Sequence, residues 1–314
     1  MEEKYKEYTI VRLNADNLHE LQTLTKAVWG YTPDIKILHL KYFHPNPKHS
    51  FLGYFAFDQN GQVAGFQGAT RLSIAYQNET QPIAQSTDTM THPQHTSKGL
   101  FYYLANKTYQ LCKENGMITV IGYANQNSLP IFTQKLGFKI SNHLRGYHIS
   151  VATIPLEKGS YKLSFFKKAY TLYQDFVFSA YKTPYQIPYS FDREAFPILL
   201  REENLIAYKQ ARGVFSMKIE NTLLWIKIKR DLFIGDFQCP SEEEFLRVMQ
   251  KLKQLCFWAG IRAIHFQSSK GSKEEVYFEK HYPSFESLPL CYLDFGIPFP
   301  IEKLKSTFGD IDIF

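Results

Sequence analysis

The chain has 314 residues, of which 44% are hydrophobic and 21% are charged, and its formal net charge is +6. That length is typical of two domains of ordinary size, each with enough apolar residues to bury a core. The positive charge is spread along the sequence, which is compatible with an anionic ligand and gives little support to nucleic-acid binding. No apolar run approaches membrane-spanning length, and the charged start Met1-Glu2-Glu3-Lys4 precedes no apolar segment. We therefore expect a cytoplasmic protein without a nucleic-acid or membrane partner.

The cysteines and histidines give no metal signal. Four cysteines are scattered through the chain, and two of them, Cys112 and Cys256, fall on apolar faces of predicted helices. This indicates reduced thiols in a core rather than disulfides or metal ligands. His92 and His95 flank a proline, but no third ligand accompanies them at usable spacing. We predict loop histidines and no metal site.

The first 91 residues alternate strand and helix patterns. An Asn-Gly pair at positions 60 and 61 is a strong hairpin signal, and a second turn falls at 77–80. This order predicts an α+β fold with a mixed, mostly antiparallel sheet and flanking helices. The predicted elements are a strand at 8–13, helices at 18–29 and 35–43, and strands at 51–57, 63–75 and 83–91.

A helix follows the last of these strands. Leu100, Leu104 and Leu111 recur at helical spacing, so the helix begins near Gly99. Its first backbone N–H groups lack intrahelical partners, and the positive end of the helix dipole faces the preceding loop. An anion is the natural occupant of such a place. A plain strand-to-helix turn capped by Ser97 is the alternative.

The loop at 92–101, HPQHTSKGLF, and the later Lys-Leu-Gly-Phe at 135–138 resemble the acetyl-CoA site of the GNAT superfamily of N-acetyltransferases. The resemblance covers residues 7–150. The family's Arg/Gln-x-x-Gly-x-Gly pattern lacks its first residue and last glycine here, where Thr96 and Phe101 stand. The resemblance implies that acetyl-CoA is the cosubstrate and that its pyrophosphate lies against Thr96, Ser97, Lys98, Gly99, Leu100 and Phe101.

In GNAT proteins the strand after this helix, here 117–123, splays from its parallel neighbour. An asparagine beyond the strand bonds the pantetheine amides in the gap. The resemblance gives this role to Asn127 first and to Asn125 second. An ordinary asparagine-rich turn is the competing interpretation.

Acetyl transfer to an amine needs a route for the amine proton and hydrogen-bond donors for the thioester oxygen as it becomes negative. Backbone N–H groups of Met90 or Thr91 would supply the donors. The family's glutamate base corresponds to Gln85, which cannot act as a base. Asp88 is the nearest acid, although strand alternation points it away from the Gln85 side unless a bulge intervenes. A solvated or core-bonded aspartate is the alternative.

The family's tyrosine acid is replaced here by Phe132-Thr133. A water relay with Asp88, or with Tyr123 on the neighbouring strand, is then required. Acceptor binding is assigned to the aromatic residues Tyr31 and Tyr42, whose planes suit amino sugars or other small amines. Ordinary core aromatics are the alternative.

The second half resembles a decayed copy of the first, with strand patterns at 213–219, 223–229, 232–237 and 261–266. A capping box, Ser241 to Glu244, opens its main helix. Gly116 corresponds to Gly260, an offset of 144 residues, but the phosphate loop is missing from the copy. We expect a duplicated GNAT fold, with a cofactor-binding domain at 1–153 and a degenerate domain at 154–314.

These patterns predict an acetyl-CoA-dependent N-acetyltransferase that acts on a small primary amine, with an amino sugar as the preferred acceptor class. A tandem GNAT protein that uses aminoacyl-tRNA as a peptidyltransferase is one alternative, and a non-enzymatic CoA-binding protein is another. The sequence contains no signal for the oligomeric state.

Overall fold

The computed structural model describes residues 5–154, 164–184 and 186–314. Within these residues no helix is both long and apolar enough to cross a membrane. The chain folds into two compact units, and each unit draws on both halves of the sequence. The expected continuous domains, 1–153 and 154–314, therefore differ from the units. Unit 1 comprises Met1–Asn142, Pro197–Arg212 and Leu288–Leu304, and unit 2 comprises His143–Phe196, Gly213–Ser287 and Lys305–Phe314.

Unit 1 contains a sheet with the strand order β1-β2-β3-β4-β5-β12, and β7 pairs with β3. Every pair is antiparallel except β4 and β5, which are parallel. The predicted mixed, mostly antiparallel sheet is confirmed. The strands are β1 (Thr9–Arg12), β2 (Leu52–Phe57), β3 (Val63–Tyr76), β4 (Glu79–Thr91), β5 (Thr119–Tyr123), β7 (Ile198–Leu200) and β12 (Ser284–Asp294).

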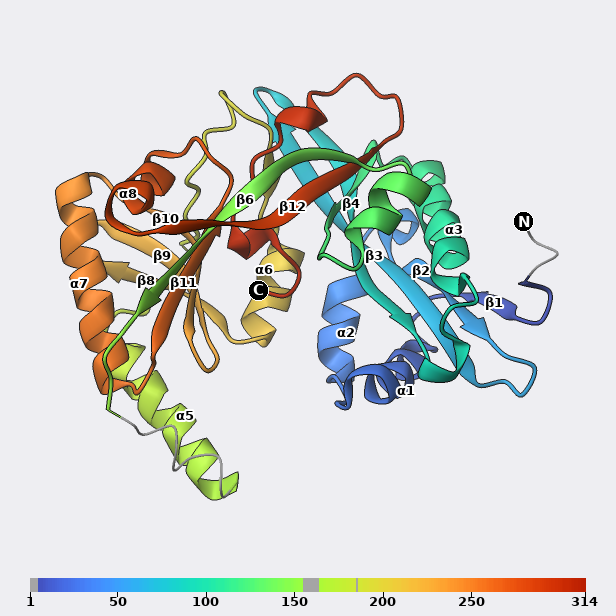
Figure 1. The fold of residues 1–314 in the computed structure, drawn as a ribbon, viewed down its shortest axis with the longest axis horizontal. Helices are drawn as coiled ribbons and strands as arrows, with labels where there is room; N and C mark the ends of the chain where they lie inside the picture. The colour runs from blue at the N-terminus through green and yellow to red at the C-terminus, as the bar shows by residue number, and fades with distance from the viewer. Residues whose placement is uncertain (1–4, 155–163, 185) are drawn as a thin grey trace. The chain divides into compact units, whose positions relative to one another are not determined.

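Helices cover both faces of this sheet (Figure 1). Phe55 and Phe66 pack in one core with α1 (Leu18–Trp29) and α2 (Ile35–Tyr42). The neighbouring small residues of the same strands, such as Ala56 and Ala64, pack in a second core with α3 (Leu100–Glu114). Alternation along the strands thus assigns α3 to the face opposite α1 and α2. Unit 1 also contains α6 (Glu203–Ala211), the five-residue π-helix η4 (Ile131–Lys135) and the 3₁₀ turns η2 (Pro47–His49), η3 (Pro93–His95) and η5 (Ile301–Lys303).

Unit 2 repeats this pattern with the strand order β6-β11-β10-β9-β8, in which β10 and β11 are the parallel pair. Its core is rich in phenylalanine and includes Phe237, Phe245, Phe266 and Phe278. The elements are β6 (Lys139–Ser150), α5 (Ser164–Ser179), β8 (Val214–Ile219), β9 (Thr222–Ile228), β10 (Leu232–Gln238), α7 (Glu242–Trp258), β11 (Ala263–Ser268), α8 (Lys273–His281) and the turn η6 (Phe308–Asp310).

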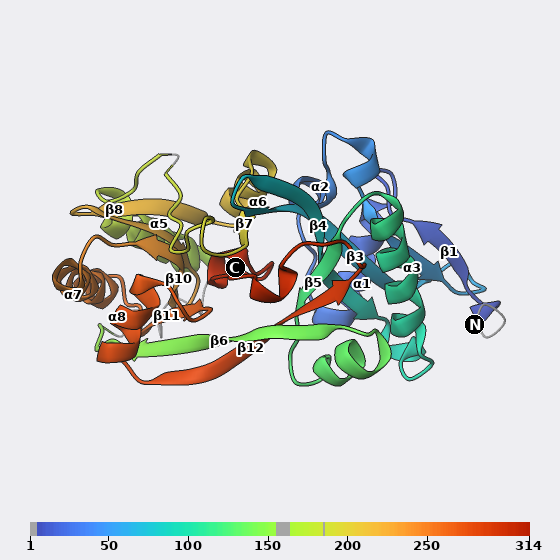
Figure 2. The same ribbon diagram turned by 90° about the horizontal axis from the view of Figure 1, so that it is seen from above.

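The last strand of each half belongs to the sheet of the other half (Figures 1 and 2). In unit 1, β12 runs antiparallel to β5, with Leu290 opposite Tyr123. In unit 2, β6 runs antiparallel to β11, with Ile149 opposite Ile264. The exchange explains why the units are discontinuous in sequence.

The two halves also agree in the order of their elements. Three strands, a helix, a parallel strand and a short helix run from β2 to η4 and again from β8 to α8. The main helix of each half is followed by a glycine in the left-handed region, Gly116 with φ 84° and Gly260 with φ 69°. These are the two glycines that the sequence offset pairs.

Candidate functional site

The parallel strands of unit 1 separate soon after they meet. Their register contains only Ala84 opposite Val120 and Gln85 opposite Ile121. Beyond this point β4 continues to Thr91 and β5 continues to Tyr123 without further pairing between them. The strand ends therefore diverge, as predicted for a splayed parallel pair.

The loop that follows β4 ends at a helix N-terminus without a side-chain cap. Gly99, the residue before α3, has φ 80°, and its side-chain-free backbone opens the helix directly. Ser97 also adopts the left-handed region, with φ 65°. Alternation of left-handed and other residues turns successive N–H groups toward one side, which creates an anion-binding concavity. This backbone, together with the uncapped helix dipole, suits an anionic group.

The predicted cofactor-binding side chains divide into exposed and buried groups. Thr96, Ser97 and Lys98 are exposed, and the Lys98 ammonium lies 3.7 Å from the Glu7 carboxylate. Leu100 is buried and Phe101 is half-buried in the cores around α3. Leu100 and Phe101 can therefore contribute only their backbone amides as candidate phosphate donors.

The turn after β5 distinguishes the two asparagines. The Asn125 side-chain oxygen accepts hydrogen bonds from the backbone N–H groups of Asn127 and Ser128, both at 3.0 Å. Asn125 therefore holds its own turn together. Asn127 is exposed, so its amide is the better candidate for a pantetheine contact.

A β-bulge lies at the position that decides the orientation of Asp88. Gly68 of β3 is opposite Thr87 and Phe66 is opposite Met90, so two residues of β4 face one residue of β3. Asp88 takes the left-handed conformation there, with φ 49°. A bulge resets the alternation of side chains along the strand. Asp88 can therefore face the same side of β4 as Gln85, which its predicted catalytic role requires.

Two side chains of α2 bind the Asp88 carboxylate. The Tyr42 hydroxyl donates to Oδ2 at 2.6 Å, and the Lys41 Nζ lies 2.7 Å from the same oxygen. The Lys41 side chain is only 4% exposed. Burial, followed by the charge of Asp88, raises the pKa of Tyr42 well above its usual range, so the phenol stays protonated and donates.

A glycine makes room for this contact. A Cβ atom at Gly68 would lie 2.5 Å from the Tyr42 hydroxyl oxygen, which is closer than any real contact. Gly68 therefore allows Tyr42 to reach Asp88 across β3.

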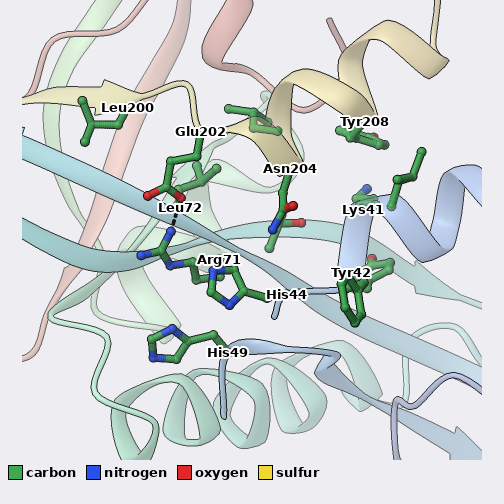
Figure 3. Close-up of a pocket in the computed structure, with 14 residues that line it drawn as sticks. Lys41, Tyr42, His44, His49, Arg71, Leu72, Leu200, Glu202, Asn204 and Tyr208 are labelled. Carbon is green, nitrogen blue, oxygen red and sulfur yellow. Dashed lines mark hydrogen bonds and ion pairs between the residues drawn. The ribbon is translucent and has the colours of Figure 1, made fainter. Parts of the chain in front are cut away.

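Lys41 and Tyr42 also line a pocket within unit 1 (Figure 3). The pocket has an empty volume of about 430 Å³, which includes space open to solvent. One wall belongs to the segment Pro197–Arg212, which comes from the second half of the chain. The lining residues are Leu40, Lys41, Tyr42, Phe43, His44, His49, Thr70, Arg71, Leu72, Leu200, Glu202, Asn204, Leu205 and Tyr208.

Part of the pocket lining lies on the strand next to the parallel pair. Thr70, one of its lining residues, is opposite Gln85 on β4, the last residue of β4 in register with β5. Of the two predicted acceptor residues, Tyr42 lines the pocket. Tyr31 lies outside it, 56% exposed and stacked on Trp29 with ring centres 6.4 Å apart.

The remaining predicted site residues lie along the two strands. Tyr123 is half-buried at the end of β5 and pairs with β12. The Met90 side chain is buried in the core, and Thr91 is opposite Gly65. The loop histidines have protein partners, since His95 Nδ1 lies 3.0 Å from the Tyr8 hydroxyl and His92 Nδ1 accepts from Gln94 N–H. All four cysteines are buried free thiols.

Sequence reasoning missed Arg71 and Glu202, which form an ion pair in the pocket. The two residues are 131 positions apart, and no local pattern links them. The role of Lys41 was not predicted either, because its burial against Asp88 depends on the bulge.

In unit 1, the parallel strands β4 and β5 separate after a short register and are joined through a helix without a side-chain cap. Residues 9–141 match the acetyltransferase (GNAT) domain family. This segment therefore has the features of a GNAT acetyltransferase domain. The resemblance predicted from the sequence is confirmed for the first half of the chain.

Solved structures share the fold across most of the chain. A GCN5-related N-acetyltransferase from Kribbella flavida has 12% sequence identity and a TM-score of 0.55, covering 90% of this chain and 71% of that chain. A conserved protein of unknown function from Enterococcus faecalis has 10% identity and a TM-score of 0.58, covering 91% and 72%. At these identities the likeness establishes the fold alone. No curated protein sequence matches the chain significantly.

Proposed function

We propose that this protein transfers the acetyl group of acetyl-CoA to the primary amine of a small acceptor, such as an amino sugar, bound in the unit 1 pocket. One observation carries the proposal. Asp88 sits in a bulge near the separation of β4 and β5, and the two residues that bind it, Lys41 and Tyr42, line the pocket. Two lining residues of the pocket thus also bind the Asp88 carboxylate, which supports a role for Asp88 next to the acceptor.

The cosubstrate side of the proposal rests on the loop before α3. The uncapped helix N-terminus and the backbone around Ser97 and Gly99 suit the pyrophosphate of acetyl-CoA. Pantetheine would then enter the gap between β4 and β5, where Asn127 is available to its amides. Members of the GNAT family generally use acetyl-CoA.

The proton route begins at the acceptor amine, which must lose a proton to attack. Asp88 accepts this proton, directly or through a water molecule, while Tyr42 and Lys41 orient its carboxylate. Backbone N–H groups of Met90 or Thr91 stabilise the thioester oxygen as it becomes negative. Tyr123, at the end of β5, is the candidate donor for the departing thiolate.

We also propose that unit 2 is a degenerate GNAT copy that binds no acetyl-CoA. The shared order of elements and the paired glycines support the duplication. The short link Cys239-Pro240-Ser241 between β10 and α7 leaves no room for a phosphate loop.

Replacing the proposed base tests the function. Asp88→Asn should lower the turnover of acetyl-CoA with an accepted amine by roughly 10²-fold or more, because general-base catalysis contributes that much. Thiol release from acetyl-CoA, measured with a panel of amines and amino sugars, gives the rate. Calorimetry with CoA should give an unchanged affinity.

Tyr42→Phe is the companion variant, since it removes one donor to Asp88 and keeps the carboxylate. We expect it to lower turnover by about tenfold, the value of one hydrogen bond to a charged group. Full turnover in Asp88→Asn would return Asp88 to a structural role, and a protein that binds CoA without acetylating any amine would favour the non-enzymatic alternative.

A further inference from the structure

The pocket contains a second polar cluster apart from Asp88. Arg71 reaches it from β3, and Figure 3 shows Glu202 on one side of the guanidinium and the His44 and His49 rings on the other. The Arg71 side chain is only 14% exposed. Its partner Glu202 is 41% exposed and also accepts a hydrogen bond from Ser73 Oγ at 2.7 Å. The guanidinium is thus held in place, while the carboxylate beside it stays open to solvent.

The Arg71 guanidinium is not fully used. Among the described residues its buried Nε atom has no hydrogen-bond partner, although Glu202 binds the terminal nitrogen Nη1. A buried N–H without a partner costs about 1–3 kcal/mol, so the hydrogen-bonding capacity of this guanidinium is not met by the chain alone. An arginine side chain presents its donors in a planar fork that matches a carboxylate or a phosphate.

One of the two histidines, His44, extends this donor set. His44 Nδ1 accepts the backbone N–H of Asn46 at 3.0 Å, which assigns the ring hydrogen to Nε2. His49 lies next to it, with ring centres 5.4 Å apart, and its Nδ1 is buried with no partner in the described part of the chain. Burial, followed by the charge of Arg71, lowers the pKa of both rings, so they are neutral at pH 7.

The opposite charge is present as well. The Glu202 carboxylate already binds Arg71, so this guanidinium is positioned to donate to a carboxylate. Glu202 binds only the Nη1 atom. A second anion beside the guanidinium would therefore contact one cation and one neutral donor, His44 Nε2, and would be repelled by one like charge, Glu202. The like charge lowers the affinity of this place for an anion without blocking it.

We propose that the Arg71 end of the pocket is a subsite for an anionic group on the acceptor. The preferred acceptor is then an amine that carries a carboxylate or a phosphate. Its amine lies toward Asp88, and its anionic group lies against the Arg71 guanidinium and His44 Nε2. The proposal rests on the proposed function for the identity of the amine end, but anion recognition itself stands on Arg71 and His44.

Matched pairs of small amines test the subsite by binding. Calorimetry on the whole protein with CoA present would compare γ-aminobutyrate with γ-aminobutyramide, and phosphoethanolamine with ethanolamine. Each pair differs in one charged group. We expect the anionic member of one pair to bind about tenfold or more tightly, since hydrogen bonds to charged groups contribute roughly 1.5–3 kcal/mol. The pair with the larger ratio distinguishes a carboxylate from a phosphate.

Variants assign the preference to Arg71. Arg71→Gln should remove the preference for the anionic member, whereas Glu202→Gln should increase it by removing the like charge. The double variant Arg71→Gln/Glu202→Gln replaces the ion pair by two amides and guards against loss of folding from an unpaired Glu202. Arg12→Gln, on the exposed part of β1, is the matched control and should bind as the parent does.

Turnover separates this proposal from the proposed function. If amines are acetylated and the neutral members of both pairs bind as tightly as the anionic ones, the subsite is disproved and the acetyltransferase remains. If the anionic member binds more tightly, through Arg71, but no amine is acetylated, the subsite stands and the proposed function fails. A preference that persists in Arg71→Gln also overturns the assignment.

Discussion

The two units contain the same helix in the same topological place, and its N-termini differ completely. In unit 1, α3 begins at Gly99 with no side-chain cap and no acidic residue in its first turn. In unit 2, α7 begins after Ser241, whose hydroxyl accepts the backbone N–H of Glu244 at 3.2 Å. Three glutamates follow in the first turn of α7. One helix dipole is open to an external anion, and the other is satisfied by its own chain.

A carboxylate from α8 completes the contrast. Glu274 Oε1 accepts the backbone N–H of Cys239 at 3.2 Å, directly after β10. The same position in unit 1 opens the loop that we propose for pyrophosphate. Glu274 is 1% exposed, and burial raises its pKa to about 7. The comparison teaches that the same order of elements does not determine the helix end, because a cap and one internal carboxylate are enough to satisfy the backbone there.

The largest expected effect comes from closing the open helix end. Gly99→Val puts a β-branched residue at φ 80° and a side chain in front of the first amides of α3. We expect CoA affinity to fall about 100-fold or more, since both the backbone path and the phosphate approach are lost. Calorimetry with CoA measures the change, and the parent protein should bind one CoA per chain.

Gly116→Val is the matched control for backbone strain. Gly116 has φ 84° at the other end of α3, with open space around it, so the variant pays the same conformational cost away from the loop. It should lose stability and keep its CoA affinity. Equal loss of CoA binding in both variants, or two CoA molecules per parent chain, would contradict the contrast between the units.

Much of unit 1 could be predicted because its signals are local. The Asn-Gly hairpin, the helical spacing of α3 and the glycine that ends it each depend on residues a few positions apart. The segment Ile131–Lys135 forms a π-helix. Local periodicity identifies a helix, but the ring of Phe132 packed on Gly122 belongs to tertiary structure.

Predictions that depended on distant partners were less complete. Of the two hydrogen bonds in the capping box at Ser241, the one from Glu244 N–H to the Ser241 hydroxyl forms. The Glu244 carboxylate instead accepts from Thr222 Oγ1 at 2.6 Å and from Asn221 N–H at 3.0 Å. The exchange of β6 and β12 has no local signal, since either strand has the same pattern in either sheet. The pairing of Arg71 with Glu202 was invisible for the same reason.

The second prediction concerns the internal carboxylate of unit 2. The pKa of Glu274 is raised to about 7 by burial, from an ordinary value of 4.5. The folded state therefore binds more protons than the unfolded state between these values, and stability falls as pH rises through this window. Glu274→Gln keeps an acceptor for Cys239 N–H and removes the titration. At pH 8 we expect it to be more stable than the parent by a few kcal/mol.

Calorimetric unfolding across the pH range from 4 to 8 provides the measurement. The parent should lose stability along this range, and the variant should follow a flatter profile. Glu243→Gln, an exposed acid in the first turn of α7, is the control and should keep the parent's profile. CoA affinity should be equal in all three proteins. A Glu274→Gln profile as steep as the parent's would show that this carboxylate is not the group that titrates.

The smallest expected effect tests the two helix ends by the same change. Ser241→Ala removes the cap of α7 and should cost about 1 kcal/mol of stability, the usual contribution of an N-terminal serine cap. Ser97→Ala, in the loop before α3, removes a hydroxyl that caps no helix, so the free energy of unfolding should stay within about 0.5 kcal/mol of the parent. Its CoA affinity should fall by a few-fold if the hydroxyl contacts phosphate. Chemical denaturation and CoA titration of both variants distinguish a structural serine from a ligand-binding one.

A stability loss in Ser97→Ala equal to that in Ser241→Ala would mean that both helix ends are capped by their own chain. The proposed open anion site at α3 would then be wrong.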